Sequence, residues 1–446
     1  MKRHLIQQLE SWKQSEDRQP LLLMGARQVG KTWLMQEFGR RCFNHTAYVR
    51  FDNDPNLRRA FEQDFDVARL IEAIHIRTGV PVLPQKTLII LDEIQECPAA
   101  LTSLKYFCED FPQYAVVAAG SLLGVEELYG TGFPVGKVER LMLHPMSFTE
   151  FVEAVAGEQY ADLLIQGRAD MITTFSSKYE ELLRYYYYIG GMPQVVSHFV
   201  QHRDFTKVRT LQKRLLEDYR ADFRKHTDAS TARAMTMLWN SLPAQLAREN
   251  KRFIYAEVNR KAGENVKTSR FREPLAWLEA AGLVYPVKRV NLPELPLSAY
   301  TDEAFKLFFL DVGLLSAMCE LPAEVLLEQN RVFAQYKGAL TEQYVQQELR
   351  AQGCTPYYWA GRQGQAEVDF LISVRGRILP IEAKAERNLQ AKSLPRFCRL
   401  YRMNEAVRTS MLPEYAVREM NAPGGEPYTY TLTDIPLYAV RCIAQG

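Results

Sequence analysis

The stretch from residue 21 to residue 32, LLLMGARQVGKT, restricts the possible folds of this chain more than any other. Its apolar first half is typical of a buried strand, and its second half has the spacing GxxxxGK[ST]. Such a loop needs a strand before it and a helix after it, because its backbone N–H groups curl around phosphates at the helix N-terminus. We expect Lys31 to reach the β- and γ-phosphates and the Thr32 hydroxyl to be a Mg²⁺ ligand. The residues expected to bind the nucleotide are Gly25, Ala26, Arg27, Gln28, Val29, Gly30, Lys31 and Thr32.

A second motif lies in the stretch TLIILDEIQ, and its Asp92 stands sixty residues after Thr32. Residues 87–91 predict a buried parallel strand with two acids at its end. Asp92 is expected to hold the Mg²⁺ through water, and Glu93 to be the catalytic residue that polarises the water attacking the γ-phosphate. The alternative is a strand end with two solvated acids, which the presence of both motifs disfavours.

Three further strands complete a predicted sheet, at residues 47–52, 114–121 and 139–147. The second of them, YAVVAAGS, ends at Ser121, which either contacts the γ-phosphate or the attacking water or simply belongs to a turn. Five strands separated by helical stretches predict an α/β fold, a doubly wound parallel sheet with its ligand at the carboxyl ends of the strands. We place this P-loop domain at residues 1–150.

In chain order, GARQVGKT, LIILDEIQ, AAGS and LHPMSFTEF resemble the AAA-superfamily P-loop ATPases of prokaryotes that carry a C-terminal domain of unknown function. The later stretches YYIGGMPQVV, FKLFFLDVGLL, GALTEQYVQQEL and AEVDFLI also look like that family, so the resemblance covers nearly the whole chain. It implies ATP and Mg²⁺ as cofactors and ATP hydrolysis as the reaction. Relatives usually have a Gly-Arg pair before LxPxSF, whereas this chain has Gly136-Lys137 followed by Arg140. Either Lys137 or Arg140 is therefore a candidate for the finger that stabilises transition-state charge.

Residues 151–225 predict a helical connector that is broken once at Gly190-Gly191. The tyrosines at 185–188 have helical spacing and predict core packing, with contact to a nucleotide or base as the alternative. His198 and His202 lie four residues apart, but an HExxH pattern and a third ligand are missing, so we do not expect zinc.

Residues 226–324 predict a winged helix, because residues 253–290 contain a helix, a turn, a second helix and a strand pair. Two interpretations of its basic residues remain open. The helix enters a DNA groove or binds phosphates, or it packs against another domain or subunit with its cations in solvent. The basic residues are Arg260, Lys261, Lys267, Arg270 and Arg272.

Residues 325–446 predict a separate module that contains the stretch EVDFLISVRGRILPIEAK. Alternation of apolar and polar residues indicates two strands joined by a tight turn. A helix, GALTEQYVQQELRAQG, precedes these strands, and a basic helix follows them. The acids stand at strand ends that can converge, where flanking apolar residues would bury them in part.

Asp369 on the first strand and Glu382 on the second are expected to bind one divalent ion, Mg²⁺ or Mn²⁺. Lys384 shares a face with Glu382 and would orient the attacking water or offset phosphate charge, and Glu342 on the preceding helix is a further candidate ligand. This arrangement resembles the PD-(D/E)xK nuclease superfamily, which implies catalytic roles for Asp369, Glu382 and Lys384. The alternative is an edge hairpin with a solvated Glu–Lys pair.

The basic helix after this stretch has cations that largely share one face, which suits a phosphate backbone or ordinary solvated surface. They are Lys392, Arg396, Arg399 and Arg402.

Composition limits the remaining function classes. The net charge of +2 is too small to indicate nucleic acid or membrane by itself, and no apolar run approaches the ~18 residues of a membrane span. Seven cysteines without a CxxC pair favour a reduced, cytoplasmic protein.

Together these observations predict a cytoplasmic ATPase whose hydrolysis cycle moves a winged helix and a nuclease-like module relative to each other on DNA. A homo-oligomer is compatible with this prediction, since winged helices of ATPases often form oligomer contacts. A nucleotide-dependent regulatory switch with a catalytically inactive C-terminal binding domain is the alternative. A signalling NTPase without a nucleic-acid partner is a third hypothesis.

Overall fold

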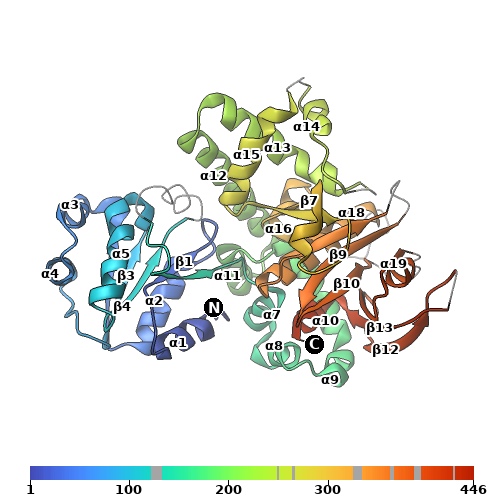
Figure 1. Cartoon of the computed structure of the whole chain (residues 1–446), viewed down its shortest axis with the longest axis horizontal. Coiled ribbons are helices and arrows are strands. Elements are labelled where there is room, and N and C mark those ends of the chain that lie inside the picture. Colours follow the sequence, from blue (N-terminus) through green and yellow to red (C-terminus); the bar gives the residue numbers. More distant parts are fainter. Residues whose placement is uncertain are drawn as a thin grey trace. The chain divides into compact units, whose positions relative to one another are not determined.

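The computed structural model describes residues 1–121, 133–248, 251–263, 267–324, 334–361, 366–385, 393–424 and 427–445 (Figure 1). The chain divides into two compact units. The first comprises Met1–His144 with Ala280–Leu283, and the second comprises Pro145–Glu279 with Val284–Gly446.

The first unit contains a five-stranded sheet in the order β2-β3-β4-β1-β5, and every pairing in it is parallel. All five strands expected from the sequence are present, which confirms the predicted parallel sheet. Because β4 lies between β1 and β3, the residues that follow these three strands lie at one edge of the sheet. The strands are β1 (Leu21–Met24), β2 (His45–Arg50), β3 (Thr87–Asp92), β4 (Ala115–Ala119) and β5 (Glu139–Met142).

Helices cover both faces of this sheet. Alternate strand residues such as Ala47 and Ile89 form one core with residues of α3, α4 and α5. Helix α2 packs on the other face, where its Gly39 lies against Thr46, and α1 packs against α2. The sheet is therefore doubly wound. The helices are α1 (Ile6–Gln14), α2 (Lys31–Cys42), α3 (Pro55–Gln63), α4 (Val67–Thr78) and α5 (Pro98–Asp110).

The second unit begins with the helices expected from the sequence. Tyr186, Tyr187 and Tyr188 are buried, and the ring of Tyr185 packs on Phe199 at a centroid distance of 5.7 Å, so the tyrosine run belongs to the core. The helices are α7 (Phe148–Ala156), α8 (Glu158–Ile165), α9 (Ala169–Thr174), α10 (Ser176–Ile189), α11 (Pro193–His202) and α12 (Phe205–His226).

A buried polar cluster joins the start of α7 to the turn between α10 and α11. The Met146 N–H donates to the Gly191 carbonyl at 2.7 Å, and the Gly191 N–H donates to Asp311 Oδ2 at 2.6 Å. A Cβ atom at Gly191 would lie 2.1 Å from the Met146 carbonyl oxygen. Nearby, the Phe148 N–H donates to Glu348 Oε1 at 2.7 Å. Four stretches that are distant in sequence therefore meet through backbone groups and two buried acids.

The next segment, for which a winged helix was predicted, contains three helices, a 3-10 turn and a strand pair among its described residues. They are α13 (Ala229–Leu246), α14 (Tyr255–Ala262), a 3-10 turn (Thr268–Phe271), α15 (Arg272–Ala280), β6 (Val284–Val290) and β7 (Thr301–Phe309). Strands β6 and β7 form an antiparallel hairpin, and α16 (Val312–Met318) follows. Strand β6 also pairs in parallel with β8. One eight-stranded sheet, in the order β12-β13-β11-β10-β9-β8-β6-β7, therefore crosses the boundary predicted at residue 325.

The C-terminal part contributes the other six strands of this sheet. The predicted hairpin is present, because β9 and β10 pair antiparallel around a turn with positive φ at Arg375 (48°) and Gly376 (74°). Strand β11 pairs in parallel with β10, and α19 buries Leu394 and Phe397 in a core with residues of β9 and β11. The elements are α18 (Ala334–Ala351), β8 (Tyr357–Ala360), β9 (Glu367–Val374), β10 (Arg377–Ala383), α19 (Ser393–Tyr401), β11 (Glu405–Ser410), β12 (Ala416–Asn421), β13 (Thr429–Pro436) and a 3-10 segment (Leu437–Gln445).

In the described part of the chain, every helix is too short or too polar to cross a bilayer. All seven cysteines are free thiols.

Candidate functional site

The loop between β1 and α2 has the backbone that a phosphate-binding loop requires. Gly25 and Gly30 have φ values of 153° and 96°, and Gln28 is left-handed at 66°. A Cβ atom at Gly25 would lie 2.3 Å from the Leu143 carbonyl oxygen, so glycine is the only residue that fits there without a shift of the backbone. Ala26, Arg27, Gln28 and Val29 complete the loop, and α2 begins at Lys31. The N-terminus of a twelve-residue helix therefore follows the loop directly.

The side chain of Lys31 folds back onto its own loop. Its Nζ donates to the carbonyl oxygens of Gly25 and Ala26, both at 2.9 Å. Burial lowers the pKa of Lys31 to about 8, although the charges of Glu93 and Asp92 act in the opposite direction. The ammonium group is thus held by weak neutral acceptors that an anionic phosphate can replace.

Asp92 and Thr32 meet beside this lysine, as the two motifs predicted. The Thr32 Oγ1 donates to Asp92 Oδ2 at 2.7 Å, and Asp92 is only 2% exposed at the end of β3. The hydroxyl of Tyr48, on the neighbouring strand β2, donates to the same oxygen at 2.9 Å. A hydroxyl and a carboxylate oxygen are hard ligands that suit Mg²⁺, so the donor set fits the ion that the motifs imply.

Tyr48 was not predicted from the sequence. Burial, followed by the charge of Asp92, raises the pKa of Tyr48 above its usual value, so the phenol stays a hydrogen-bond donor. Only its position in β2, the strand that pairs with the strand ending at Asp92, could have indicated this contact.

Glu93 and Ser121 lie after neighbouring strands. Glu93 has a left-handed backbone with φ 52°, and its Oε2 accepts from Gln95 Nε2 at 2.5 Å. Ser121 is half-buried and follows β4, which pairs with both β1 and β3. The fold therefore puts both residues at the sheet edge that carries the loop.

The two finger candidates lie at the start of β5. Lys137 Nζ pairs with Glu109 Oε1 at 2.9 Å, and the Arg140 guanidinium lies over the ring of Phe133, 4.7 Å from its centroid. Arg140 is in register with Leu22 of the parallel strand β1, near the amino end of that strand, whereas the phosphate loop follows its carboxyl end. Lys137 precedes β5 altogether. Both cations thus stand toward the amino end of β5.

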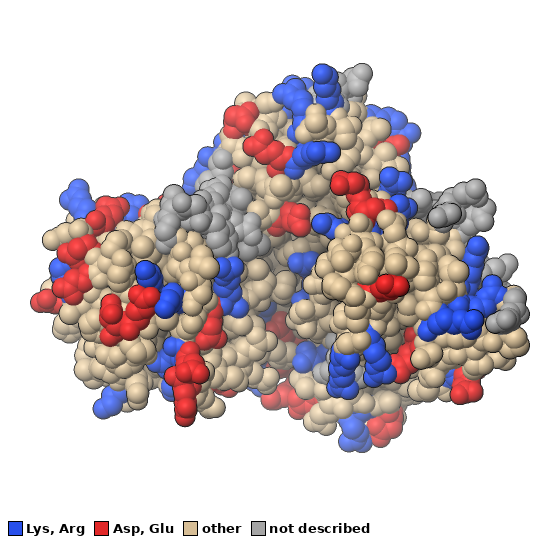
Figure 2. All heavy atoms as spheres, viewed as in Figure 1, with Lys and Arg blue, Asp and Glu red and all other residues tan. Residues whose placement is uncertain are grey.

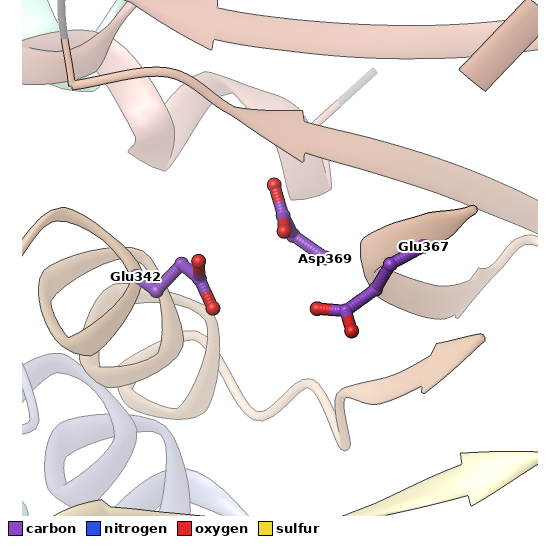
Figure 3. A group of neighbouring side chains, drawn as sticks. All are labelled: Glu342, Glu367 and Asp369. Carbon is purple, nitrogen blue, oxygen red and sulfur yellow. The ribbon is translucent and has the colours of Figure 1, made fainter. Parts of the chain in front are cut away.

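The second unit contains a separate cluster of carboxylates. Glu342 on α18 and Glu367 and Asp369 on β9 point toward one another, and they offer ligand oxygens within 4.8 Å of each other (Figure 3). Glu367 is two residues before Asp369 and shares its face of the strand, but it was not predicted as a ligand. Among the described residues, this is the one group of side chains that could hold a metal ion. It does not include His198 or His202.

Glu382 and Lys384 form an ion pair at one side of this cluster, with Lys384 Nζ 2.6 Å from Glu382 Oε1. Glu382 Oε2 is buried and has no hydrogen-bond partner among the described residues. Asp369 Oδ2 accepts from the Ala383 N–H at 2.8 Å. Burial, and then the charges of Glu342 and Glu382, raise the pKa of Asp369 well above its usual value. The predicted pair Asp369 and Glu382 is therefore close together, but the tightest group of oxygens includes Glu342 and Glu367 instead of Glu382.

Two further lysines neutralise the cluster, and neither was predicted. Lys306 Nζ lies 3.0 Å from Glu342 Oε2 and 2.5 Å from Glu367 Oε1, and Lys251 Nζ lies 2.5 Å from Glu342 Oε1. Burial raises the pKa of Glu342, but these two lysines outweigh it and lower that pKa to about 2. Glu342 is thus ionised, and it binds two ammonium groups.

Four of the cations predicted for nucleic acid, Arg260, Lys267, Arg270 and Arg272, are exposed, and Arg260 also pairs with Glu257 at 2.5 Å. Figure 2 shows Lys and Arg side chains gathered in the part of the view where α14 lies in Figure 1. The side chain of Lys261 lies outside the described residues.

The basic residues predicted around α19 differ in exposure. Arg396 and Arg402 are exposed, whereas Arg399 packs against Gly424, where an added Cβ would lie 2.8 Å from its Nη1. Lys392 lies outside the described residues. Arg399 is half-buried, and Arg402 follows the last residue of α19.

Family models match three segments of the chain. Residues 17–152 match an AAA domain, residues 180–325 a domain of unknown function (DUF8612), and residues 337–422 another domain of unknown function (DUF4143). A search of curated proteins finds no match.

Solved structures with some likeness to the chain include the Walker-type ATPase PABY2304 of Pyrococcus abyssi, at 13% identity and a TM-score of 0.45. That comparison covers 70% of this chain and 94% of the other. The Orc1 protein of Aeropyrum pernix in complex with DNA matches at 14% identity and a TM-score of 0.29, over 72% and 92% of the two chains. A RuvB variant of Thermotoga maritima matches at 15% identity and 0.29, over 65% and 86%. These scores are too low to establish a common overall fold.

The assignment of the first unit depends on three independent observations. The family match at residues 17–152 covers both nucleotide motifs, the sheet is parallel and doubly wound, and the loop after β1 has the glycine geometry of a phosphate cradle. Residues 17–152 therefore form an AAA domain with the fold of P-loop ATPases, and residues 337–422 match a C-terminal domain of unknown function.

Proposed function

We propose that residues 1–150 bind ATP together with Mg²⁺ and hydrolyse it to ADP and phosphate. The observation that carries this proposal is the 2.7 Å hydrogen bond between Thr32 and Asp92, which lie on different elements but meet beside Lys31. These residue types at this junction are those that hold a nucleotide and its metal ion in P-loop enzymes.

Each residue has a defined task in this proposal. Lys31 leaves the carbonyls of its own loop and binds the β- and γ-phosphates, while the loop N–H groups bind phosphate oxygens. Thr32 and Asp92 hold the Mg²⁺, which when bound neutralises charge that develops on the phosphates. Glu93 orients the attacking water and accepts its proton, and Ser121 contacts the γ-phosphate.

Tyr48 keeps the Asp92 carboxylate in place by donating to Oδ2, so that Oδ1 stays directed toward the Glu93 N–H. A finger cation would come from a second copy, because Lys137 and Arg140 stand toward the amino end of β5. This placement favours a homo-oligomer.

We propose that DNA is the partner of the second unit. Support comes from exposed Lys267, Arg270 and Arg272, which stand where the second helix of a winged helix begins. The resemblance of the C-terminal part to PD-(D/E)xK nucleases adds support. The expected sequence of helix, Asp-bearing strand, Glu-x-Lys strand and helix corresponds to α18, β9, β10 and α19.

The regulatory switch with an inactive C-terminal domain remains the second candidate function. One observation favours it: the carboxylates that would bind a catalytic metal are paired with lysines, including the fully buried Lys306. In this case the second unit binds DNA or a protein without cleaving it.

Phosphate release from ATP tests the proposal in mixtures with Mg²⁺, with EDTA, and with Mg²⁺ and DNA. Hydrolysis should require Mg²⁺ and be lost in Lys31→Ala, which controls for contaminating enzymes. Binding of labelled DNA should weaken steeply with salt, as phosphate contacts require.

The lengths of the DNA strands in the same mixtures separate the two candidates for the second unit. Cleavage that disappears in Asp369→Ala supports a nuclease, and intact DNA under Mg²⁺ and Mn²⁺ supports the switch. Mg²⁺-independent phosphate release, or release that persists in Lys31→Ala, would contradict the assignment of the ATP site.

A further inference from the structure

The ammonium group of Lys306 occupies the centre of the C-terminal carboxylate cluster. Its Nζ lies 3.0 Å from Glu342 Oε2, 2.5 Å from Glu367 Oε1 and 4.0 Å from Asp369 Oδ1. These are the three residues whose oxygens converge in Figure 3. A cation therefore already stands where a shared divalent ion would bind.

Lys306 reaches this position from another part of the sheet. It belongs to β7, the outer strand of the β6–β7 hairpin, and its Nζ lies 5.1 Å from the centroid of the Tyr358 ring on β8. The side chain of Lys306 is 0% exposed, so the whole stem is enclosed. The carboxylates lie on α18 and β9, so this one side chain connects the hairpin to the C-terminal strands.

A divalent ion and this ammonium group exclude each other. Carboxylate oxygens bind Mg²⁺ or Ca²⁺ at roughly 2.0–2.6 Å, so an ion shared by Glu342 and Glu367 would overlap with the Lys306 nitrogen. An ammonium group donates hydrogen bonds but cannot coordinate a metal or activate its water.

An independent observation indicates that the site contains a further carboxylate that could bind a cation. Glu382 follows Ile381, which pairs with Phe370, so in this antiparallel register it stands opposite Asp369 and on its face of the sheet. Glu382 is 4% exposed, and its Oε2 is buried with no hydrogen-bond partner among the residues that the structure describes. A buried carboxylate oxygen without a donor is costly unless a cation or a proton compensates it.

We propose that Lys306 is the resident cation of this site and that a divalent ion binds Glu342, Glu367 and Asp369 only when the Lys306 ammonium is absent or withdrawn. The β6–β7 hairpin thereby controls whether the C-terminal domain contains a metal site. The inference concerns these carboxylates alone and does not depend on ATP hydrolysis.

Mn²⁺ binding to nucleotide-free protein tests this inference, measured by calorimetry and by the shift of the unfolding temperature. Lys306→Met should gain one Mn²⁺ site per chain that the wild type lacks, with an affinity at least about tenfold above any wild-type binding. It should be less stable than the wild type without metal and recover stability with Mn²⁺. Lys288→Met removes an exposed lysine from the same hairpin and should behave as the wild type.

Two further variants make the result decisive. Lys306→Met with Asp369→Asn should lose the added site, which assigns it to the cluster. If Lys306→Met does not fold, Lys306→Met with Glu367→Gln removes one charge of each sign and should still bind Mn²⁺ through Glu342 and Asp369. Equal Mn²⁺ binding by wild type and Lys306→Met, or no added site in any folded Lys306 variant, would overturn the proposal.

Discussion

Replacing Glu93 with glutamine is expected to lower steady-state ATP turnover by about 10²- to 10⁴-fold, the usual contribution of a general base. Glutamine keeps the shape of the side chain, but its amide cannot accept a proton from the attacking water. ATP binding should persist, because Lys31 and the loop are unchanged and Asp92 keeps its hydrogen bond with Thr32.

The measurement is phosphate release at saturating ATP, accompanied by nucleotide affinity. Glu96→Gln is the matched control, since Glu96 is an exposed acid three residues further along and should turn over ATP at the wild-type rate. Wild-type turnover in Glu93→Gln would exclude Glu93 as the base.

Replacing Gly191 with alanine should destabilise the second unit by at least about 3 kcal/mol, at the upper end for a forced steric overlap. The new Cβ would lie 2.1 Å from the Met146 carbonyl oxygen and 2.8 Å from the Met146 nitrogen. Both contacts are with backbone, so rotation of a side chain cannot relieve them. Separating the two segments would also break the Met146–Gly191 hydrogen bond and strain the one to Asp311.

Gly338→Ala is expected to have the opposite effect on stability. Gly338 lies in α18 with open space where a Cβ would be, so alanine should stabilise this helix by about 0.5–1 kcal/mol. Urea unfolding followed by circular dichroism measures both variants, and added ATP identifies the transition of the first unit. A Gly191→Ala protein as stable as the wild type would show that Met146 is free to move.

The fold and the nucleotide site of the first unit could be predicted because the residues that determine them are close together in the sequence. A strand, a glycine loop and a helix are adjacent in the chain, and the position of Asp92 at a strand end fixes its edge of the sheet. Parallel pairing of β1 and β3 with β4 then brings Asp92 and Thr32 to the same edge of the sheet. Tyr48 was not predicted, because its contact with Asp92 follows only once β2 is known to pair with β3.

The C-terminal site could be predicted only in part, because some of its residues are distant from one another in the sequence. Asp369 and Glu382 follow from strand alternation and one tight turn, and Glu342 from the preceding helix. Lys306 appears in its own segment as a polar residue in an apolar strand, and nothing local predicts its burial. That burial is tolerated because the compensating acids come from positions 342, 367 and 369, which only the completed sheet brings near.

The most direct test of the central claim is calorimetric titration of folded protein with ATP and Mg²⁺ at pH 7 and pH 9. The account predicts one site per chain at pH 7 that Lys31→Ala and Asp92→Asn weaken. Because burial lowers the pKa of Lys31 to about 8, the free protein carries a neutral amine at pH 9 and must take up a proton to bind phosphate. Affinity should therefore be about tenfold weaker at pH 9 than at pH 7. Absence of ATP binding at pH 7, or binding unaffected by both substitutions, would contradict the account.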